Sequence, residues 1–302
     1  MKILVWGNPH HVRLFEQLFE GDRDICVVSR EEEADIFYRI WGWRLTRDRS
    51  EINRTFVQVM RGKKVVFHWI GTDVLRAMRT ARQQERLISP KSLIKRMASS
   101  FVKRKFTHWA IASWLQGELS TIGIRSSVVP IVSPLVEAKP LPMPEQFTVL
   151  SYLPDFRPTF YGADIVYQLA ELNPDVRFII VAAQKSLKNL PNVEVRSWVD
   201  RQTMDSIHKE SSCLVRLTEH DGLASTVLES LARGRYVIWS YDFPYVFKAR
   251  TLAQAQKVLR EVKDKIRPNF EGAEYVRTEF SLAKVKQMTK NGFLGLMSGN
   301  TP

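Results

Sequence analysis

Residues 213–239 read CLVRLTEHDGLASTVLESLARGRYVIW and hold the clearest structural pattern in the chain. An apolar run, CLVRL, leads into a short acidic loop. Residues 225–233 then have a helical pattern, and the apolar run YVIW follows. Gly222 permits a tight turn, and Gly234 stands where helices commonly end. Two buried strands joined by a helix predict a β-α-β unit of a parallel sheet.

The loop before this helix has the features of an anion site. The backbone N–H groups of Gly222, Leu223 and Ala224, with the helix start at Ser225, suit a diphosphate. Glu229 lies one turn further on the same helix face, where its carboxylate could accept hydrogen bonds from both hydroxyls of a ribose. The alternative is an ordinary strand–loop–helix joint with a capping acid.

Strands and helices alternate on both sides of this unit. We expect strands at 2–7, 25–29, 34–40, 64–69, 108–112, 127–132, 147–153, 176–182, 193–197, 213–217 and 236–239. Helices are expected at 9–19, 52–61, 114–122, 161–172, 203–210, 225–233, 253–266 and 281–290. Prolines at 140, 142 and 144 favour an extended connector. The sequence thus predicts an α/β protein with two doubly wound, Rossmann-like domains, 1–138 and 139–302.

Composition and charge exclude several classes of protein. The 302 residues have an ordinary globular composition, and no apolar run is long enough to span a membrane. We therefore expect a soluble, cytoplasmic protein. Cys26 and Cys213 lie in apolar runs and are expected to be buried core residues. The D-x-D sequence at 22–24 precedes a strand and is interpreted as a solvated turn, so no bound metal is expected.

Residues 221–238 resemble the donor-site signature of retaining GT-B glycosyltransferases of the glycosyltransferase family 4 (group 1) type. Asp221 and Glu229 stand at the two acids of the family's E-x7-E pattern. The resemblance implies the GT-B fold, in which two Rossmann-like domains face a central cleft. It places Asp221 beside the donor sugar, the loop amides on the diphosphate and Glu229 on the ribose.

The first half carries a second resemblance. VFHWIGTDV at 66–74 resembles the family's strand followed by H-G-T-D-V, with two residues inserted after the histidine. The resemblance implies that His68 lies at the cleft, close to the donor sugar. On the acceptor side of the same cleft we expect side chains from two segments: Asn8, His10, His11, Thr72 and Asp73.

The chain departs from the family at Asp221, where the family has a Glu that is one methylene longer, and in one loop of the second half. The family carries G-R-x3-K-G after the first strand of its second domain, and the Arg and Lys contact the donor diphosphate. Here Pro154 and Tyr161 occupy those two positions. Arg157 lies in the same loop and could supply a cation for the leaving diphosphate. The candidate catalytic set is therefore His68, Arg157 and Asp221.

The resemblance implies an enzyme that moves a sugar from a nucleotide-sugar donor to an acceptor hydroxyl with retention. It would need neither metal nor other cofactor, and the acceptor would be a glycan or a lipid-linked molecule in cell-surface assembly. Two alternatives remain open. One is a non-catalytic nucleotide-sugar-binding subunit of polysaccharide assembly, and the other is a GT-B nucleotide-sugar epimerase.

The net charge is +13, from 45 basic and 32 acidic residues, and most of the surplus lies in the first half. Residues 91–106, KSLIKRMASSFVKRKF, place apolar side chains at helical spacing among six basic ones. A core helix with a solvated basic face is one interpretation. The other is an interfacial helix that docks on an anionic membrane from the cytoplasmic side. No nucleic-acid partner is expected, because no recognised module accompanies the charge.

Overall fold

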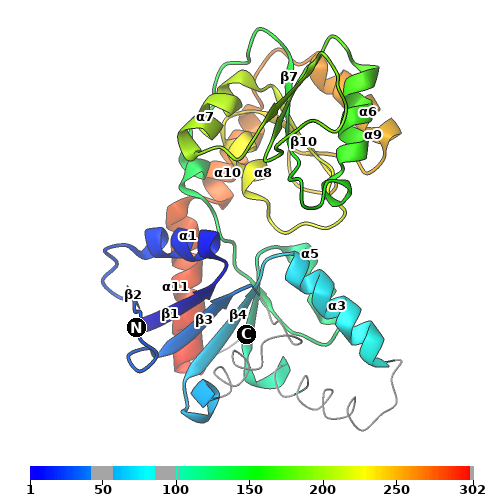
Figure 1. The fold of residues 1–302 in the computed structure, drawn as a ribbon. Coiled ribbons are helices and arrows are strands. Elements are labelled where there is room, and N and C mark those ends of the chain that lie inside the picture. Colours follow the sequence, from blue (N-terminus) through cyan, green and yellow to red (C-terminus); the bar gives the residue numbers. More distant parts are fainter. Residues whose placement is uncertain (42–56, 86–99, 101–102, 300–302) are drawn as a thin grey trace. The chain divides into compact units, whose positions relative to one another are not determined.

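The computed structural model describes residues 1–41, 57–85, 100 and 103–299. Residues 282–302 group with residues 1–132 in a first compact unit, and residues 133–281 form a second unit (Figure 1). Each unit contains a six-stranded parallel sheet with helices. The predicted α/β fold with two parallel sheets is confirmed.

The first sheet has the strand order β2-β1-β3-β4-β5-β6. Its strands are β1 (Lys2–Gly7), β2 (Cys26–Val27), β3 (Ile36–Ile40), β4 (Lys64–Trp69), β5 (Thr107–Ala110) and β6 (Ser127–Val128). The helices of this unit are α1 (Pro9–Phe19), α3 (Thr72–Glu85), α5 (Ser113–Thr121) and α11 (Leu282–Ser298). Because all neighbouring strands are parallel, their carboxyl ends meet at one edge.

Helix α11 packs against the first sheet, although it follows the second unit in the chain (Figure 1). Phe293 is fully buried and contacts Phe15 of α1, Tyr38 of β3 and Trp109 of β5. A Cβ on Gly292 would come within 2.6 Å of Trp109, so this glycine allows the helix to approach closely. The sequence instead assigned residues 282–302 to the C-terminal domain.

Charged residues hold the same helix beside the turn after α1. Asp22 Oδ1 accepts the backbone N–H groups of Asp24 and Ile25, at 2.9 and 3.1 Å. Its other oxygen lies 3.0 Å from Nζ of Lys286, and Lys290 pairs with Asp24. These hydrogen bonds lower the pKa of Asp22 to about 2. The D-x-D sequence therefore shapes a turn and anchors α11.

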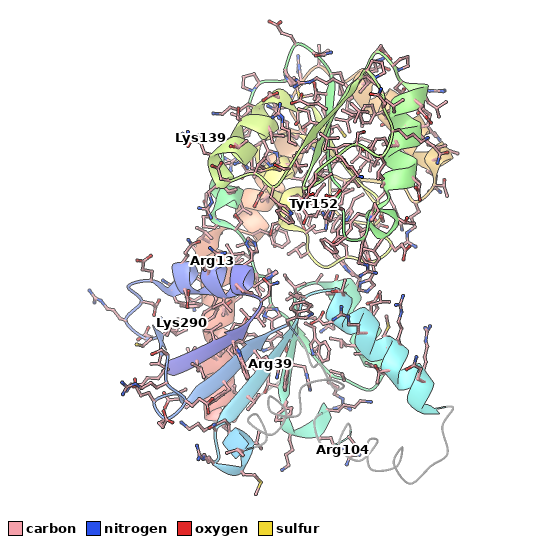
Figure 2. The ribbon with its side chains drawn as sticks, in the orientation of Figure 1. Arg13, Arg39, Arg104, Lys139, Tyr152 and Lys290 are labelled. Carbon is pink, nitrogen blue, oxygen red and sulfur yellow. The ribbon has the colours of Figure 1, made fainter. Side chains whose placement is uncertain are left out.

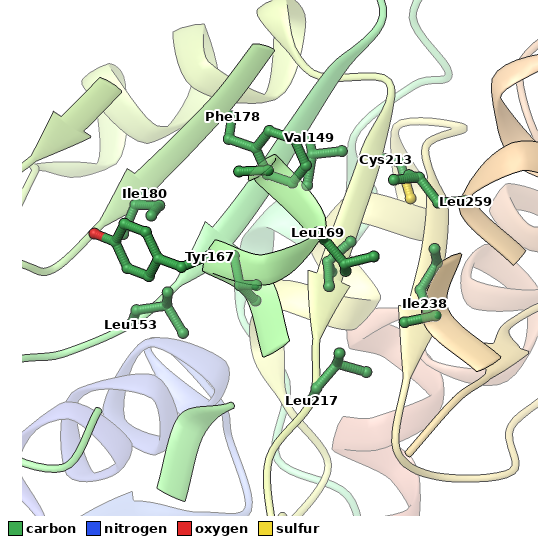
Figure 3. Close-up of a cluster of buried hydrophobic side chains, with 14 of the residues drawn as sticks. Val149, Leu153, Tyr167, Leu169, Phe178, Ile180, Cys213, Leu217, Ile238 and Leu259 are labelled. Carbon is green, nitrogen blue, oxygen red and sulfur yellow. The ribbon is translucent and has the colours of Figure 1, made fainter. Parts of the chain in front are cut away.

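The second sheet has the order β12-β11-β10-β7-β8-β9. Its strands are β7 (Thr148–Tyr152), β8 (Arg177–Val181), β9 (Val193–Arg196), β10 (Cys213–Arg216), β11 (Tyr236–Trp239) and β12 (Phe247–Lys248). Its helices are α6 (Ala163–Leu172), α7 (Arg201–Glu210), α8 (Ser225–Ala232), α9 (Leu252–Lys263) and α10 (Phe270–Glu279), with 3-10 turns η1 (Pro134–Glu137) and η2 (Thr159–Tyr161). Figure 3 shows part of the core, where Tyr167 and Leu169 of α6 pack with side chains of the central strands.

Two buried arginines after α8 fix the proline-containing connector within the second unit. Arg235 donates to the carbonyls of Leu141 and Pro142, and the backbone of Arg233 accepts the N–H of Leu141. Burial, with the charge of Arg233, lowers the pKa of Arg235 to about 10. The connector therefore belongs to the second unit, which begins at Ser133 instead of the expected residue 139.

Several local expectations differ from the structure. Cys26 is exposed, whereas Cys213 is buried as expected. Helices α3 and α10 and the short strand β12 had no counterpart in the predicted elements. Most of the basic segment 91–106, and the first part of the helix expected at 52–61, lie outside the described residues.

Candidate functional site

The loop between β10 and α8 lies at the carboxyl edge of the second sheet. Ala224 is the N-cap residue of α8, and no side chain caps the helix there. The N-cap residue therefore supplies no side-chain acceptor to the first turn, and a helix start of this kind can bind an anion. Gly222 and Leu223, in the loop before this turn, are buried, and Ser225 is partly exposed.

The carboxylate of Asp221 is held by three side chains. Arg216, the last residue of β10, donates from Nε to Oδ2 at 2.6 Å and from Nη2 to Oδ1 at 3.1 Å. Thr218 Oγ1 and Trp239 Nε1 each donate to Oδ2 at 3.2 Å. The side chains of Arg216 and Asp221 are only 9% and 12% exposed, respectively. The Asp221 carboxylate, expected beside the donor sugar, is thus engaged within the protein.

The guanidinium of Arg216 also lies between two tyrosines. Its central carbon is 5.5 Å from the ring of Tyr152 and 5.8 Å from that of Tyr161, within cation–π range. Tyr152, labelled in Figure 2, ends β7. Burial, and to a smaller extent the nearby Tyr161, raises the pKa of Tyr152 to about 12. The Tyr152 hydroxyl therefore keeps its proton at neutral pH.

The loop after β7 packs on the loop after β10. A Cβ on Gly162 would lie 2.4 Å from the carbonyl oxygen of Leu217, and Gly162 has a φ of +79°. Only glycine fits there without a shift of the backbone. Glu219 also donates its N–H to the carbonyl of Phe160 at 2.9 Å. Arg157 stacks on Phe160, with its guanidinium carbon 3.8 Å from the ring centre.

Aromatic side chains that the sequence interpretation missed surround this edge. Trp198, just after β9, is 67% exposed and meets Tyr152 edge-on, with 5.8 Å between ring centres. Phe156 is equally exposed and packs edge-on against Tyr161. A sequence signal existed, because both residues follow strands that end at this edge.

Glu229 lies on α8 one turn after Ser225, as predicted from spacing, and is 7% exposed. Its Oε2 is 3.9 Å from Nε2 of His208, on α7. Burial lowers the pKa of His208, although Glu229 acts in the opposite direction. The imidazole is therefore neutral near pH 7.

In the first unit, His68 is fully buried near the end of β4. Its Nδ1 lies 2.5 Å from the hydroxyl of Tyr38, which is also buried. Burial lowers the pKa of His68 to about 3, so it is neutral. Tyr38 and His68 therefore form a buried pair.

The segment after β1 presents a more accessible histidine. Asn8 Oδ1 caps α1 by accepting the N–H of His10 at 3.0 Å, and His11 Nδ1 lies 3.3 Å from the same oxygen. An oxygen accepts only, so Nδ1 carries the hydrogen and Nε2 is the acceptor of the ring. Burial, with the nearby His10, lowers the pKa of His11 to about 4.

Asp73 is a structural residue of the loop between β4 and α3. It is buried, and its Oδ1 accepts the backbone N–H groups of Ile70, Gly71 and Val74 at 2.8 to 3.1 Å. Thr72, the first residue of α3, is partly exposed.

The described part of the chain has no cluster of three or more His, Cys, Asp or Glu suited to a metal ion. Nor does any described helix have the length and apolarity to cross a membrane.

Comparison with solved structures identifies the fold. Anabaena HepE, solved in complex with UDP and glucose, superposes with a TM-score of 0.70 at 10% identity, over 97% of this chain and 98% of HepE. The fold is GT-B. Sucrose-phosphate synthase from Thermosynechococcus elongatus matches with a TM-score of 0.65 at 10% identity, over 88% of this chain and 74% of the synthase.

A third match is the pneumococcal O-GlcNAc transferase GtfA, solved in complex with UDP and GlcNAc. Its TM-score is 0.56 at 9% identity, over 95% of this chain and 60% of GtfA. No protein-family model matches the sequence, and no curated protein matches it. At 9–10% identity, this chain therefore differs widely in sequence from these three proteins.

Proposed function

We propose that this chain is a glycosyltransferase that moves a sugar from a UDP-sugar to an acceptor hydroxyl. The observation that carries the proposal is the glycine loop that leads to the uncapped start of α8, at the carboxyl edge of a parallel sheet. Ligands of open α/β sheets bind at that edge. HepE and GtfA, which share the GT-B fold, were both solved with UDP and a sugar.

In the proposed donor site, backbone N–H groups from Gly222 to Ser225 hold the diphosphate. Glu229 accepts hydrogen bonds from the ribose hydroxyls. Arg157 supplies positive charge at the leaving phosphate. Preorganised donors of this kind stabilise the charge that develops as the glycosidic bond breaks.

The proposed reaction forms a bond between the acceptor oxygen and the anomeric carbon. The bond from that carbon to the diphosphate breaks, its electron pair goes to the phosphate oxygen, and the acceptor hydroxyl passes its proton to the departing phosphate. We propose that configuration is retained and that no metal takes part, as the sequence resemblance implies. The acceptor is proposed to be a glycan or lipid-linked molecule of cell-surface assembly.

The first unit is proposed to contact the acceptor through residues at the carboxyl edge of its own sheet. Nε2 of His11 can accept a hydrogen bond from an acceptor hydroxyl, and Asn8, His10 and Thr72 lie at the starts of helices α1 and α3. Asp73 supports this edge by shaping its loop. His68 is proposed to act indirectly, as a buried neighbour of His11.

Calorimetry with UDP, GDP and ADP, followed by turnover of UDP-glucose and UDP-GlcNAc with EDTA present, tests this function. We expect preferential binding of UDP and slow release of UDP from at least one UDP-sugar without added acceptor. Saturable binding without turnover would favour the binding-subunit alternative. Conversion of one UDP-sugar into another without release of UDP would favour an epimerase. Absence of binding to all three nucleotides would refute the proposal.

We also propose that the basic segment 91–106 holds the enzyme reversibly on anionic membranes, although most of it lies outside the described residues. Each basic residue near an anionic surface contributes about 1 kcal/mol, and salt screens the attraction. We expect the protein to sediment with anionic vesicles at low salt and to be released at high salt. Equal recovery in the supernatant with anionic and neutral vesicles would contradict membrane binding.

A further inference from the structure

We propose that Arg216 and Asp221 act together as a positioning pair that neutralises and fixes the diphosphate-binding loop, and that Asp221 does not bind the donor sugar. This inference rests on the proposed function, because it assigns roles within the same donor site. It also differs from the sequence resemblance, which placed Asp221 beside the sugar.

The geometry of the pair supports the positioning role. Arg216 holds both carboxylate oxygens of Asp221, with Nε donating to Oδ2 at 2.6 Å and Nη2 donating to Oδ1 at 3.1 Å. Thr218 and Trp239 direct two more donors at Oδ2. A side-on contact of this kind orients a carboxylate strongly. A sugar hydroxyl would have to compete with donors that the protein already supplies.

The electrostatics explain why the pair is needed. Asp221 directly precedes Gly222, so its negative charge lies within one residue of the loop proposed to bind a diphosphate. A carboxylate there would repel the ligand, and burial would strengthen the repulsion. Burial disfavours the charged form of Arg216, but the carboxylate outweighs it and raises the pKa of Arg216 above its ordinary value. The guanidinium therefore stays charged and cancels Asp221.

The pair also anchors the loop mechanically. Arg216 ends β10, which pairs with β11 and β7 in the middle of the sheet. The backbone N–H of Asp221 donates to the hydroxyl of Tyr241 at 2.9 Å. The side chain and the backbone of Asp221 are thus both fixed. The backbone N–H groups from Gly222 onward are therefore held in position before a ligand binds.

Three variants separate this role from that of a sugar-binding acid: Arg216→Gln, Asp221→Asn and the double variant. Their affinities for UDP, UDP-glucose and uridine are measured by calorimetry at low and high salt. Arg216→Gln leaves an uncompensated carboxylate at the loop. We expect it to weaken UDP binding by at least about tenfold, more at low salt, and to leave uridine binding unchanged.

Asp221→Asn should bind UDP at least as well as the wild type, since it removes a negative charge and leaves Arg216 in place. It should also keep the wild-type ratio of UDP-glucose to UDP affinity. The double variant should recover wild-type UDP affinity to within about threefold, because no uncompensated charge remains and the contacts with Thr218, Trp239 and Tyr241 still hold the loop. If Arg216→Gln does not fold, the comparison of Asp221→Asn with the double variant still tests the pair.

A selective loss of UDP-glucose affinity in Asp221→Asn, with UDP binding intact, would overturn the proposal and return Asp221 to the sugar. Weak UDP binding in the double variant would also overturn it, since Arg216 would then contact the diphosphate itself. Failure of the wild type to bind any nucleotide would instead refute the proposed function. The wild type and the variants therefore test the two proposals separately.

Discussion

His208 lies beside Glu229, with 3.9 Å between Nε2 of the imidazole and Oε2 of the carboxylate. The imidazole is fully buried, and its burial lowers its pKa, so it stays neutral near pH 7. A neutral imidazole beside the carboxylate restricts the glutamate side chain. Glu229 can therefore offer its carboxylate oxygens to a ligand one turn after the start of α8.

Substitution of Glu229 by Gln should weaken UDP binding because the amide keeps the shape of the side chain and loses its charge. A hydrogen bond to a charged acceptor contributes about 1.5–3 kcal/mol, so the dissociation constant should rise by about tenfold or more. Calorimetric titration with UDP measures this change.

The matched control is Glu261→Gln, on the exposed face of α9, which should leave UDP affinity unchanged. Titration with 2′-deoxy-UDP adds a second check, because removal of a ribose hydroxyl should cost the wild type more affinity than the Glu229 variant. Unchanged UDP affinity in Glu229→Gln would remove this residue from the donor site.

The buried His68 and the partly buried His11 of the first unit predict a pH-dependent stability. The folded-state pKa is about 3 for His68 and about 4 for His11, below the ordinary value of 6.5. As the pH falls below 6.5, the unfolded chain takes up protons before the folded one does, so folding stability decreases. Above about pH 7 these residues add no pH dependence.

Urea unfolding between pH 7.5 and pH 5 should show this loss of stability. Most carboxylates titrate below about pH 5, so histidines account for most of the change in stability between pH 7.5 and pH 5. His68→Gln should lower the slope of the unfolding free energy against pH, by up to the contribution of about one titrating proton. The same slope in His68→Gln and wild type would show that His68 is protonated in the folded protein.

Arg233→Met should destabilise the second unit. Arg233 is 2% exposed, and its guanidinium donates to Asp205 at 2.7 and 3.0 Å and to the carbonyls of Leu135 and Glu229. Methionine fills the space but leaves these acceptors without their donor. We expect a loss of roughly 2–4 kcal/mol in the free energy of unfolding, measured with urea.

Arg277→Met is the control for this prediction. Arg277 lies on the exposed face of α10, and its ion pair with Glu274 is open to solvent. Its substitution should change stability by less than about 0.5 kcal/mol. Similar losses in the two variants would mean that the buried network adds nothing beyond a surface ion pair.

The parts of the fold that sequence predicted well are those set by local pattern. Strands β1, β4 and β11 and helix α1 have the expected bounds, because apolar runs and the Asn8-Pro9 helix start determine them within a few residues. The assignment of α11 to the first unit depends on the fit of Phe293 and Gly292 among side chains far away in sequence. No local pattern carries that information.

The candidate site could be predicted from sequence in part. Spacing alone placed Glu229 one turn beyond Ser225 on α8, as the structure has it. The Arg216–Asp221 pair is also local, since the two residues are five positions apart, but CLVRL was interpreted as a buried strand and its arginine was passed over. A basic residue at the end of an otherwise apolar strand, five positions before an acid, is the signal that could have revealed it.

Arg157→Ala should slow turnover much more than it weakens UDP binding. Arg157 is the arginine of the loop that packs against the loop after β10, and its stacking on Phe160 directs the guanidinium. Negative charge on the diphosphate grows as the donor bond breaks, so a cation nearby acts mainly in the transition state. We expect UDP-sugar turnover to fall by about a hundredfold and the dissociation constant of UDP to change much less.

Arg157→Lys should recover part of the rate, and Arg201→Ala, on an exposed residue of α7, should change neither quantity. Stability should fall by no more than the roughly 1 kcal/mol of an accessible cation–π contact, which separates a catalytic loss from unfolding. Full turnover in Arg157→Ala would show that another group neutralises the leaving phosphate.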